Sequence, residues 1–208
     1  MNSYPFLPPG QNLILTGYIG PGQPAIAQQV AERLKRRFIN VEREIEARAE
    51  MDIEALRARY GESRLKTVES EVLRDVLLYR GAVIRISGQT LMHGDYARRL
   101  QENGTILCLV VTLDAALRRL HLTLGARYHN PHERALSIGH LKREWAVRRL
   151  DGIHELDLTY LSDAESIEAV IQRWQALALG AERALVNGNG SGSGNGNGHR
   201  NGAVQKLR

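Results

Sequence analysis

The chain has 208 residues, of which 43% are hydrophobic and 25% charged, and these values are typical of a globular protein with one domain. A chain of this length can bury a core without disulfides or metals, and no apolar run is long enough to span a membrane. The net charge is +5, but three of these charges lie in residues 181–208, so we expect neither a nucleic-acid partner nor a membrane.

Residues 1–11 are a proline-rich lead-in without periodicity and without the apolar run of a signal peptide. Leu13–Thr16 then predicts a buried strand, and Ala25–Arg37 predicts a helix with one apolar face. Between them, the glycine-rich segment Gly17–Gly22 is typical of a phosphate-binding loop, in which backbone N–H groups and a helix N-terminus surround an anion.

This segment keeps the glycine frame of the motif G-x-x-x-x-G-K-[ST] but not its polar residues. Gly17 and Gly22 have the right spacing, and Gly20 lies between them. Gln23 stands at the position of the lysine, and Pro24 stands at the position of the hydroxyl that binds magnesium. We therefore expect a kinase-like scaffold in which Gly17, Gly20, Gly22 and Gln23 contribute to nucleotide binding, but whose chemistry toward ATP is damaged.

The rest of the chain alternates between strand patterns and helix patterns. Such alternation predicts an α/β fold with a mostly parallel sheet that is covered on both faces. A polar segment rich in Arg and His, residues 125–137, reads as a mobile loop. The expected strands are residues 38–41, 82–86, 105–111 and 155–159, and the expected helices are residues 42–49, 52–59, 63–79, 94–102, 115–122, 140–149 and 164–177.

We expect three parts in the chain: a lead-in at residues 1–11, a domain at residues 12–180, and a flexible tail at residues 181–208. The tail is rich in Gly, Asn and Ser and cannot bury enough apolar surface to offset the entropy of ordering it. The single cysteine, Cys108, lies within an apolar run, which indicates a buried thiol in a reducing compartment. The sequence therefore favours a cytoplasmic protein.

The ordered series of motifs resembles the shikimate kinase family over roughly residues 12–178. After the loop come the segments Phe38–Glu46, Gly61–Glu69 and Ser87–Gln89, and later Arg127 and Arg148, in the order of that family. The resemblance implies a P-loop three-layer α/β sandwich with a five-stranded parallel sheet in the order 2-3-1-4-5. It also implies ATP and Mg²⁺ as cofactors if the protein is active, and a shikimate-like acidic metabolite as partner.

Several positions depart from what the resemblance implies for catalysis. Asn40 and Glu42 match the two aspartates of the family's D-x-D motif, of which the first lies near the metal and the second binds the acceptor hydroxyl and can act as its base. Glu42 keeps a carboxylate, and a surface glutamate at a helix start is an equally good interpretation. The family's three-glycine motif has become Ser87-Gly88-Gln89, in which Gly88 alone remains for the approach of substrate.

The cationic positions are better preserved. Lys66 and Arg148 stand where the family has arginines for the shikimate carboxylate, and Arg127 stands where a lid arginine contacts ATP. The chain has 28 Lys and Arg residues, so each of these three could equally be a solvated surface cation. A cluster of His129, His132 and His140 with Glu133 could suggest a metal, but a pH-sensitive or inert polar loop is the better interpretation, and we expect no metal site.

These observations leave several functions open. The first is a shikimate kinase-like protein with impaired or lost phosphoryl transfer, which binds a small acidic metabolite or a protein partner that the sequence does not identify. The second is a divergent active shikimate kinase, which converts ATP and shikimate to ADP and 3-phosphoshikimate in aromatic amino-acid biosynthesis. A kinase with another acceptor and a pure interaction module are further alternatives. Whether the chain is an enzyme at all is left open by the sequence.

Overall fold

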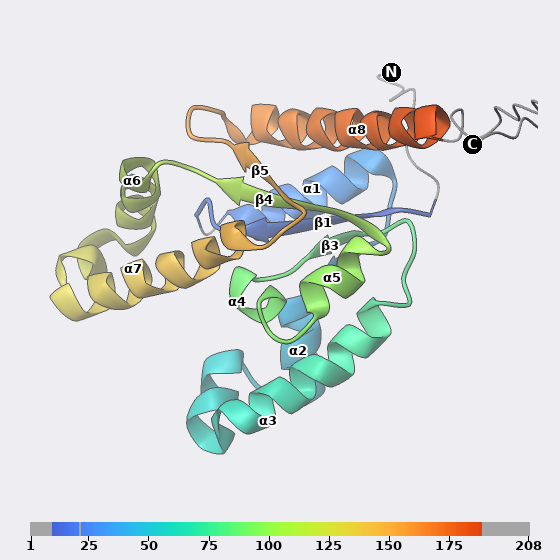
Figure 1. Cartoon of the computed structure of the whole chain (residues 1–208). Helices are drawn as coiled ribbons and strands as arrows, with labels where there is room; N and C mark the ends of the chain where they lie inside the picture. The colour runs from blue at the N-terminus through green and yellow to red at the C-terminus, as the bar shows by residue number, and fades with distance from the viewer. Residues whose placement is uncertain (1–9, 21, 189–208) are drawn as a thin grey trace, which may run out of the picture.

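A five-stranded parallel sheet forms the centre of the molecule, in a computed structural model that describes residues 10–20 and 22–188 (Figure 1). The strand order is β2-β3-β1-β4-β5, which confirms the order implied by the resemblance. β1 lies in the middle and pairs with both β3 and β4. The strands are β1 Asn12–Gly17, β2 Phe38–Asn40, β3 Val83–Arg85, β4 Gly104–Val110 and β5 Ile153–Asp157.

Helices connect these strands and cover both faces of the sheet, as the alternating pattern predicts. The α-helices are α1 Gln23–Leu34, α2 Val41–Ala49, α3 Ile53–Val76, α4 Gly88–Leu91, α5 Tyr96–Gln101, α6 Leu113–Leu124, α7 Pro131–Trp145 and α8 Asp163–Gly188. Two 3₁₀ turns, η1 Gly125–His129 and η2 Ala146–Arg149, lie on either side of α7. None of the helices in the described part of the chain is long and apolar enough to cross a membrane.

Two apolar clusters hold the layers together, one on each face of the sheet. In β1 the side chains of Leu13 and Leu15 join the cluster beneath α1 and α8, whereas Ile14 joins the cluster beneath α3 and α5. Because successive residues of a strand point to opposite faces, a strand that is covered on both sides must be apolar throughout. Trp174 of α8 and Leu73 of α3 are fully buried at the two outer layers.

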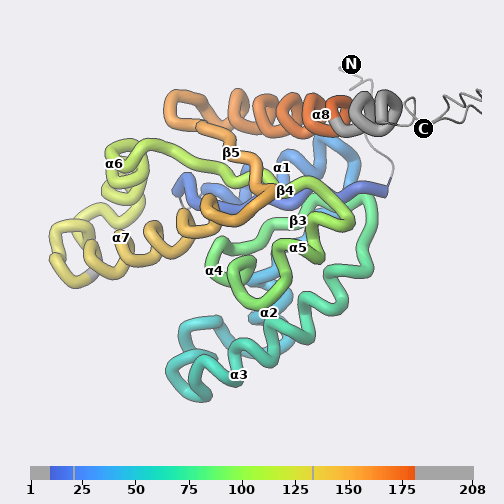
Figure 2. The backbone as a smooth tube through the Cα atoms, viewed as in Figure 1, coloured from blue at the N-terminus to red at the C-terminus, as the bar shows by residue number. Residues whose placement is uncertain are grey.

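The carboxyl ends of β1 and β4 both point toward the side of the molecule where α6 and α7 lie (Figure 2). In open parallel sheets, ligands bind outside the carboxyl ends of the strands, at the point where the strand order reverses. That point lies here between β1 and β4, because the connection after β1 leads to β2 on one side of the sheet and the connection after β4 leads to β5 on the other. The loop Gly17–Gly22 follows β1 at this edge.

The two expected helical pieces within α3 are confirmed, because the helix is interrupted at Gly61, whose φ of +79° and ψ of 172° are not helical. Two other local features differ from the sequence expectation. The polar segment that reads as a loop contains η1 and the start of α7, because Pro131 suits the first turn of a helix and Asn130 accepts a hydrogen bond from the His132 N–H. Finally, α8 continues to Gly188, beyond the expected end at residue 177.

The buried thiol is confirmed, because Cys108 lies in β4 with no exposed surface, and burial raises its pKa to about 12. The expected lead-in, up to residue 9, and residues 189–208 of the expected tail lie outside the described residues.

Candidate functional site

The loop between β1 and α1 has the glycine positions that a phosphate-binding loop needs. Gly17 has a φ of +85°, and a Cβ atom there would lie 2.4 Å from the backbone oxygen of Leu109. Gly20 has a φ of +127°, which side chains rarely adopt. Gly22 is the N-cap of α1, and Pro24 lies in the first turn, where its missing N–H costs nothing. Gly17 and Gly20 therefore have backbone conformations that favour glycine.

Gln23 turns back toward β1 instead of extending from the loop. Its side chain is only 1% exposed, and its Nε2 donates a hydrogen bond to the backbone oxygen of Thr16 at 3.2 Å. Its Oε1 atom is buried without a hydrogen-bond partner in the described structure, as is the hydroxyl of Thr16. An unpartnered buried oxygen costs roughly 1–3 kcal/mol, so the native state carries this cost at the base of the loop.

Two long side chains from α6 and α7 bind the backbone of the loop. Nη1 of Arg119 donates to the Ile19 oxygen at 2.7 Å, and its Nη2 donates to the Leu158 oxygen at 3.3 Å. Nε1 of Trp145 donates to the Tyr18 oxygen at 2.9 Å. Arg119 therefore connects the loop to α6, and Trp145 connects it to α7.

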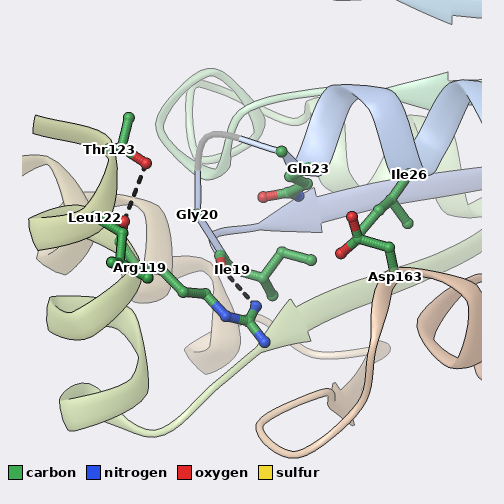
Figure 3. A pocket seen from close by; sticks show the side chains of 9 residues that line it. Ile19, Gly20, Gln23, Ile26, Arg119, Leu122, Thr123 and Asp163 are labelled. Atoms are coloured by element: carbon green, nitrogen blue, oxygen red, sulfur yellow. Dashed lines mark hydrogen bonds between the residues drawn. The ribbon is translucent and has the colours of Figure 1, made fainter.

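A cavity of about 290 Å³ opens between this loop, α6 and the start of α8 (Figure 3), and we call it the loop cavity. Its cation is Arg119, and that guanidinium is already bound to two backbone oxygens. Its anion is Asp163, the first residue of α8. The full lining is Ile19, Gly20, Gly22, Gln23, Ile26, Arg119, Leu122, Thr123 and Asp163.

The residues of the loop cavity do not fit MgATP bound in the usual way. A phosphate loop holds the β- and γ-phosphates with an extended lysine, whereas Gln23 is neutral and buried against Thr16. Pro24 has no hydroxyl for Mg²⁺, and Asn40 at the end of β2 has an amide in place of a carboxylate. The carboxylate of Asp163 faces the same space and repels phosphate.

A second cavity, of about 300 Å³, lies between α2, α3, α4 and α7, and we call it the acceptor cavity. Its lining carries six carboxylates and three arginines, so it is acidic overall. The acidic residues are Glu42, Glu46, Asp52, Glu54, Glu69 and Glu144, and the basic ones are Arg57, Arg85 and Arg143, beside His140.

Glu42 lines the acceptor cavity but is already occupied by protein groups. One of its oxygens forms an ion pair with Arg85, and the other accepts a hydrogen bond from the Ser87 N–H. Both charged side chains are largely buried, with 16% and 13% of their surfaces exposed. Both carboxylate oxygens of Glu42 are therefore engaged by groups of the protein.

Gly88 is bound to α7, which explains why this one glycine of the family motif is present. Its N–H donates to a carboxylate oxygen of Glu144 at 2.7 Å, and a Cβ atom on Gly88 would lie 2.3 Å from the Glu144 backbone oxygen. Glu144 is 1% exposed, and this burial raises the pKa of its carboxyl, against hydrogen bonds from Gly88 and Gln89 that lower it. The glycine therefore serves helix packing in this chain.

The structure separates the predicted cations from the acceptor cavity. Lys66 is exposed on α3 and does not line it, and Arg148 forms an ion pair with Glu155 at 2.6 Å in β5. Arg127 is exposed in η1 and lines neither cavity. The cavity instead contains Arg143, which has no hydrogen-bond or ion-pair partner in the described part of the chain.

Sequence reasoning missed Arg143, Glu144, Arg85 and Arg119. Arg143 lies five residues before Arg148 in the same basic run. The sequence therefore indicates a substrate-binding arginine in this run, but it does not show which of the arginines lines the cavity. The other three have no motif that marks them, because each acts through a contact with a distant segment. Glu144, for example, contacts Gly88, which lies 56 residues earlier.

The histidines of the polar segment do not form a metal site among the residues that the structure describes. His121 packs against the rings of Tyr128 and His129, and His140 packs edge-on against Tyr18. Glu69, which is buried, binds His93 and the hydroxyl of Thr90. These contacts join neighbouring helices and loops, and Glu69, Thr90 and His140 also line the acceptor cavity.

Comparison with known proteins gives one consistent family. The family model "Shikimate kinase" matches residues 19–174. A shikimate kinase of Thermodesulfovibrio yellowstonii is 27% identical over 173 residues, which are 82% of this chain and 98% of that protein.

Solved structures agree in fold. A shikimate kinase from Bacteroides thetaiotaomicron superposes with a TM-score of 0.66 at 24% identity and covers 81% of this chain and 98% of its own. A shikimate kinase from Acinetobacter baumannii in complex with shikimate superposes with a TM-score of 0.63 at 18% identity, over 87% of this chain and 95% of its own. Likeness at these identities supports the architecture described above.

Proposed function

The chain belongs to the shikimate kinase family, and from this membership we propose that it is a member with impaired ATP-dependent phosphoryl transfer that still binds a small acidic metabolite. The family generally uses ATP and Mg²⁺. The observation that carries the proposal is the position of Gln23, whose side chain is buried and bonded to Thr16 where a phosphate loop needs an extended cation.

The size of the expected defect follows from the kind of contact that is missing. Phosphoryl transfer depends on positioned charges that stabilise the transition state, and the loss of one such contact typically costs a factor of roughly 10²–10³ in rate. Here the loop cation and the magnesium-binding hydroxyl are both absent, at Gln23 and Pro24. Glu42, the candidate base, is held by Arg85.

The test is an assay of Mg²⁺-dependent phosphorylation of shikimate by the purified 208-residue chain. We expect turnover at least about 10²-fold below the range of roughly 1–100 s⁻¹ that is usual for kinases. Turnover within that range would overturn the proposal and support the divergent active enzyme instead. One observation favours that alternative: the Arg119 guanidinium already lies at the loop. If it replaces the lysine, Arg119→Ala abolishes turnover.

The proposed binding of an acidic metabolite in the acceptor cavity depends on Arg143. Among the described residues, it is the arginine of that cavity without a hydrogen-bond or ion-pair partner. We expect Arg143→Ala to weaken binding of shikimate about tenfold, because a charged hydrogen bond to a carboxylate is lost. Arg148→Ala is the matched control, since Arg148 is bound to Glu155 outside the cavity and its loss should leave the affinity unchanged. Isothermal titration of both variants with shikimate measures the difference. An effect of Arg148→Ala with none of Arg143→Ala would reverse the assignment.

A further inference from the structure

A third cavity, of about 370 Å³, lies between the loop after β1, the start of α3 and the helices α6 and α7, and we call it the inter-helix cavity. It is larger than the loop cavity and the acceptor cavity, and its volume is usual for a ligand pocket. Neither the phosphate-loop motif nor the binding of shikimate in the acceptor cavity accounts for this space.

The wall of the inter-helix cavity is largely apolar and aromatic. Leu120 of α6 is buried there, and Leu136 of α7 lines the cavity with 57% of its surface exposed. The rings of Tyr18 and His140, which also belong to the lining, pack edge-on with their centres 5.5 Å apart. Burial and two nearby guanidinium groups lower the pKa of His140, so its ring is neutral near pH 7. Such a wall suits an aromatic group.

The inter-helix cavity also contains a cation that can bind an anionic ligand. Arg143 lines this cavity as well as the acceptor cavity, and it has no hydrogen-bond or ion-pair partner among the residues that the structure describes. The carboxylate of this lining, Glu54, forms an ion pair with Arg57 at 2.6 Å, which offsets its charge. A guanidinium available to a ligand therefore lies beside an apolar wall.

We propose that the inter-helix cavity binds an aromatic carboxylate, with the carboxylate on Arg143 and the ring against the apolar wall. The planar guanidinium matches the geometry of a carboxylate, and burial of the ring removes apolar surface from water. Because Arg143 also lines the acceptor cavity, this ligand and shikimate compete for one cation. The inference rests on the proposed function in one respect, namely that Arg143 binds a carboxylate.

Three probes separate the role of the charge from that of the ring. These are 3-phenylpropionate, its neutral analogue 3-phenylpropanol, and propionate, which lacks the ring. We expect 3-phenylpropionate to raise the melting temperature of the 208-residue chain. In isothermal titration it should bind about tenfold more tightly than the alcohol and at least about tenfold more tightly than propionate. Equal affinity for 3-phenylpropionate and either analogue would overturn the proposal.

Arg143→Met tests the cation, because it removes the guanidinium and keeps an unbranched side chain. We expect the affinity for 3-phenylpropionate to fall about tenfold, to that of the alcohol, while the affinity for the alcohol stays unchanged. Arg148→Met is the matched control, since Arg148 is paired with Glu155 and does not line the cavity. A preference for the acid that survives in Arg143→Met would overturn the proposal.

Leu136→Ser tests the apolar wall at a side chain that is exposed, so the variant should fold like the parent. We expect about fivefold weaker binding of 3-phenylpropionate and unchanged binding of shikimate, because Leu136 does not line the acceptor cavity. Leu113→Ser is the matched control: Leu113 of α6 is 52% exposed and lines none of the three cavities. Equal losses in the two leucine variants would contradict a ring bound at this wall.

Competition between ligands tests the shared cation. Saturating shikimate should lower the apparent affinity for 3-phenylpropionate, and independent binding of the two acids would overturn the proposal. A chain that binds shikimate but does not distinguish 3-phenylpropionate from propionate refutes this inference alone. Rapid phosphorylation of shikimate, with the preference for the aromatic acid intact, refutes the proposed impairment alone.

Discussion

Replacing Gln23 by Lys and Pro24 by Ser should raise the affinity for MgATP by a factor of about 10–100, because a hydrogen bond to a charged group contributes roughly 1.5–3 kcal/mol. Gly17 and Gly20 already have a positive φ, and Gly22 lies at the start of α1. A lysine at residue 23 would leave the apolar base of the loop for the loop cavity, because a buried ammonium without a carboxylate partner is strongly disfavoured. The serine would supply the missing ligand for Mg²⁺.

Titration with ATP and ADP, with and without Mg²⁺, measures this effect. The single variant Pro24→Ser is the control: it adds the hydroxyl without the charge and should gain little. We do not expect the double variant to regain full turnover, because Asn40 and the ion pair between Glu42 and Arg85 remain. Failure of the double variant to bind ATP would mean that the carboxylate of Asp163 or the position of Arg119 excludes nucleotide by itself.

The second large effect is expected for Gly88→Ala. The added methyl group would lie 2.3 Å from the backbone oxygen of Glu144 and 3.1 Å from its Cα, so α7 must move away from α4. Overpacking of this kind costs about 1–3 kcal/mol, and for a chain of this length each kcal/mol lowers the melting temperature by roughly 2–4 °C. The hydrogen bond from the Gly88 N–H to Glu144 would lengthen as well.

Gly180→Ala is the matched control for this variant. Gly180 lies in α8 with nothing within 4 Å of its Cβ position, so the same substitution should stabilise the chain slightly through helix propensity. Thermal unfolding of the two variants gives shifts of opposite sign if Gly88 is required for packing. If instead Gly88→Ala keeps the melting temperature and only weakens shikimate, the glycine serves the approach of substrate, as the resemblance implies.

The fold was predictable because it depends on patterns that are local in the sequence. Apolar runs such as Leu13–Thr16 mark buried strands, and Gly17 and Gly22 mark the loop between β1 and α1. The strand order came from the resemblance, and the structure confirms it. The helix α7 in the polar segment was harder to predict, because it has polar residues on several sides. Its start is indicated in the sequence only by Asn130 and Pro131.

The candidate site was predictable at its loop and much less so elsewhere. The loss of the lysine and the hydroxyl at Gln23 and Pro24 is visible in a motif of fixed spacing. The choice between Arg143 and Arg148 depends on which face of a helical segment meets the cavity, and α7 ends at residue 145, between the two. After residue 145 the chain continues as the 3₁₀ turn η2, which has fewer residues per turn than an α-helix. The change moves later side chains to another face, and sequence spacing alone does not show it.

Trp145 gives the chain a built-in optical signal for the state of its loop. Indole emission depends on the groups around the ring, and the Nε1 of Trp145 is bonded directly to the Tyr18 oxygen of the loop. The other tryptophan, Trp174 of α8, is fully buried, and the guanidinium of Arg36 lies 4.6 Å from its ring centre. Its emission therefore reports on the folded core and serves as an internal reference. A ligand that moves the loop should therefore change the emission of Trp145 relative to that of Trp174, and the measurement needs no added dye.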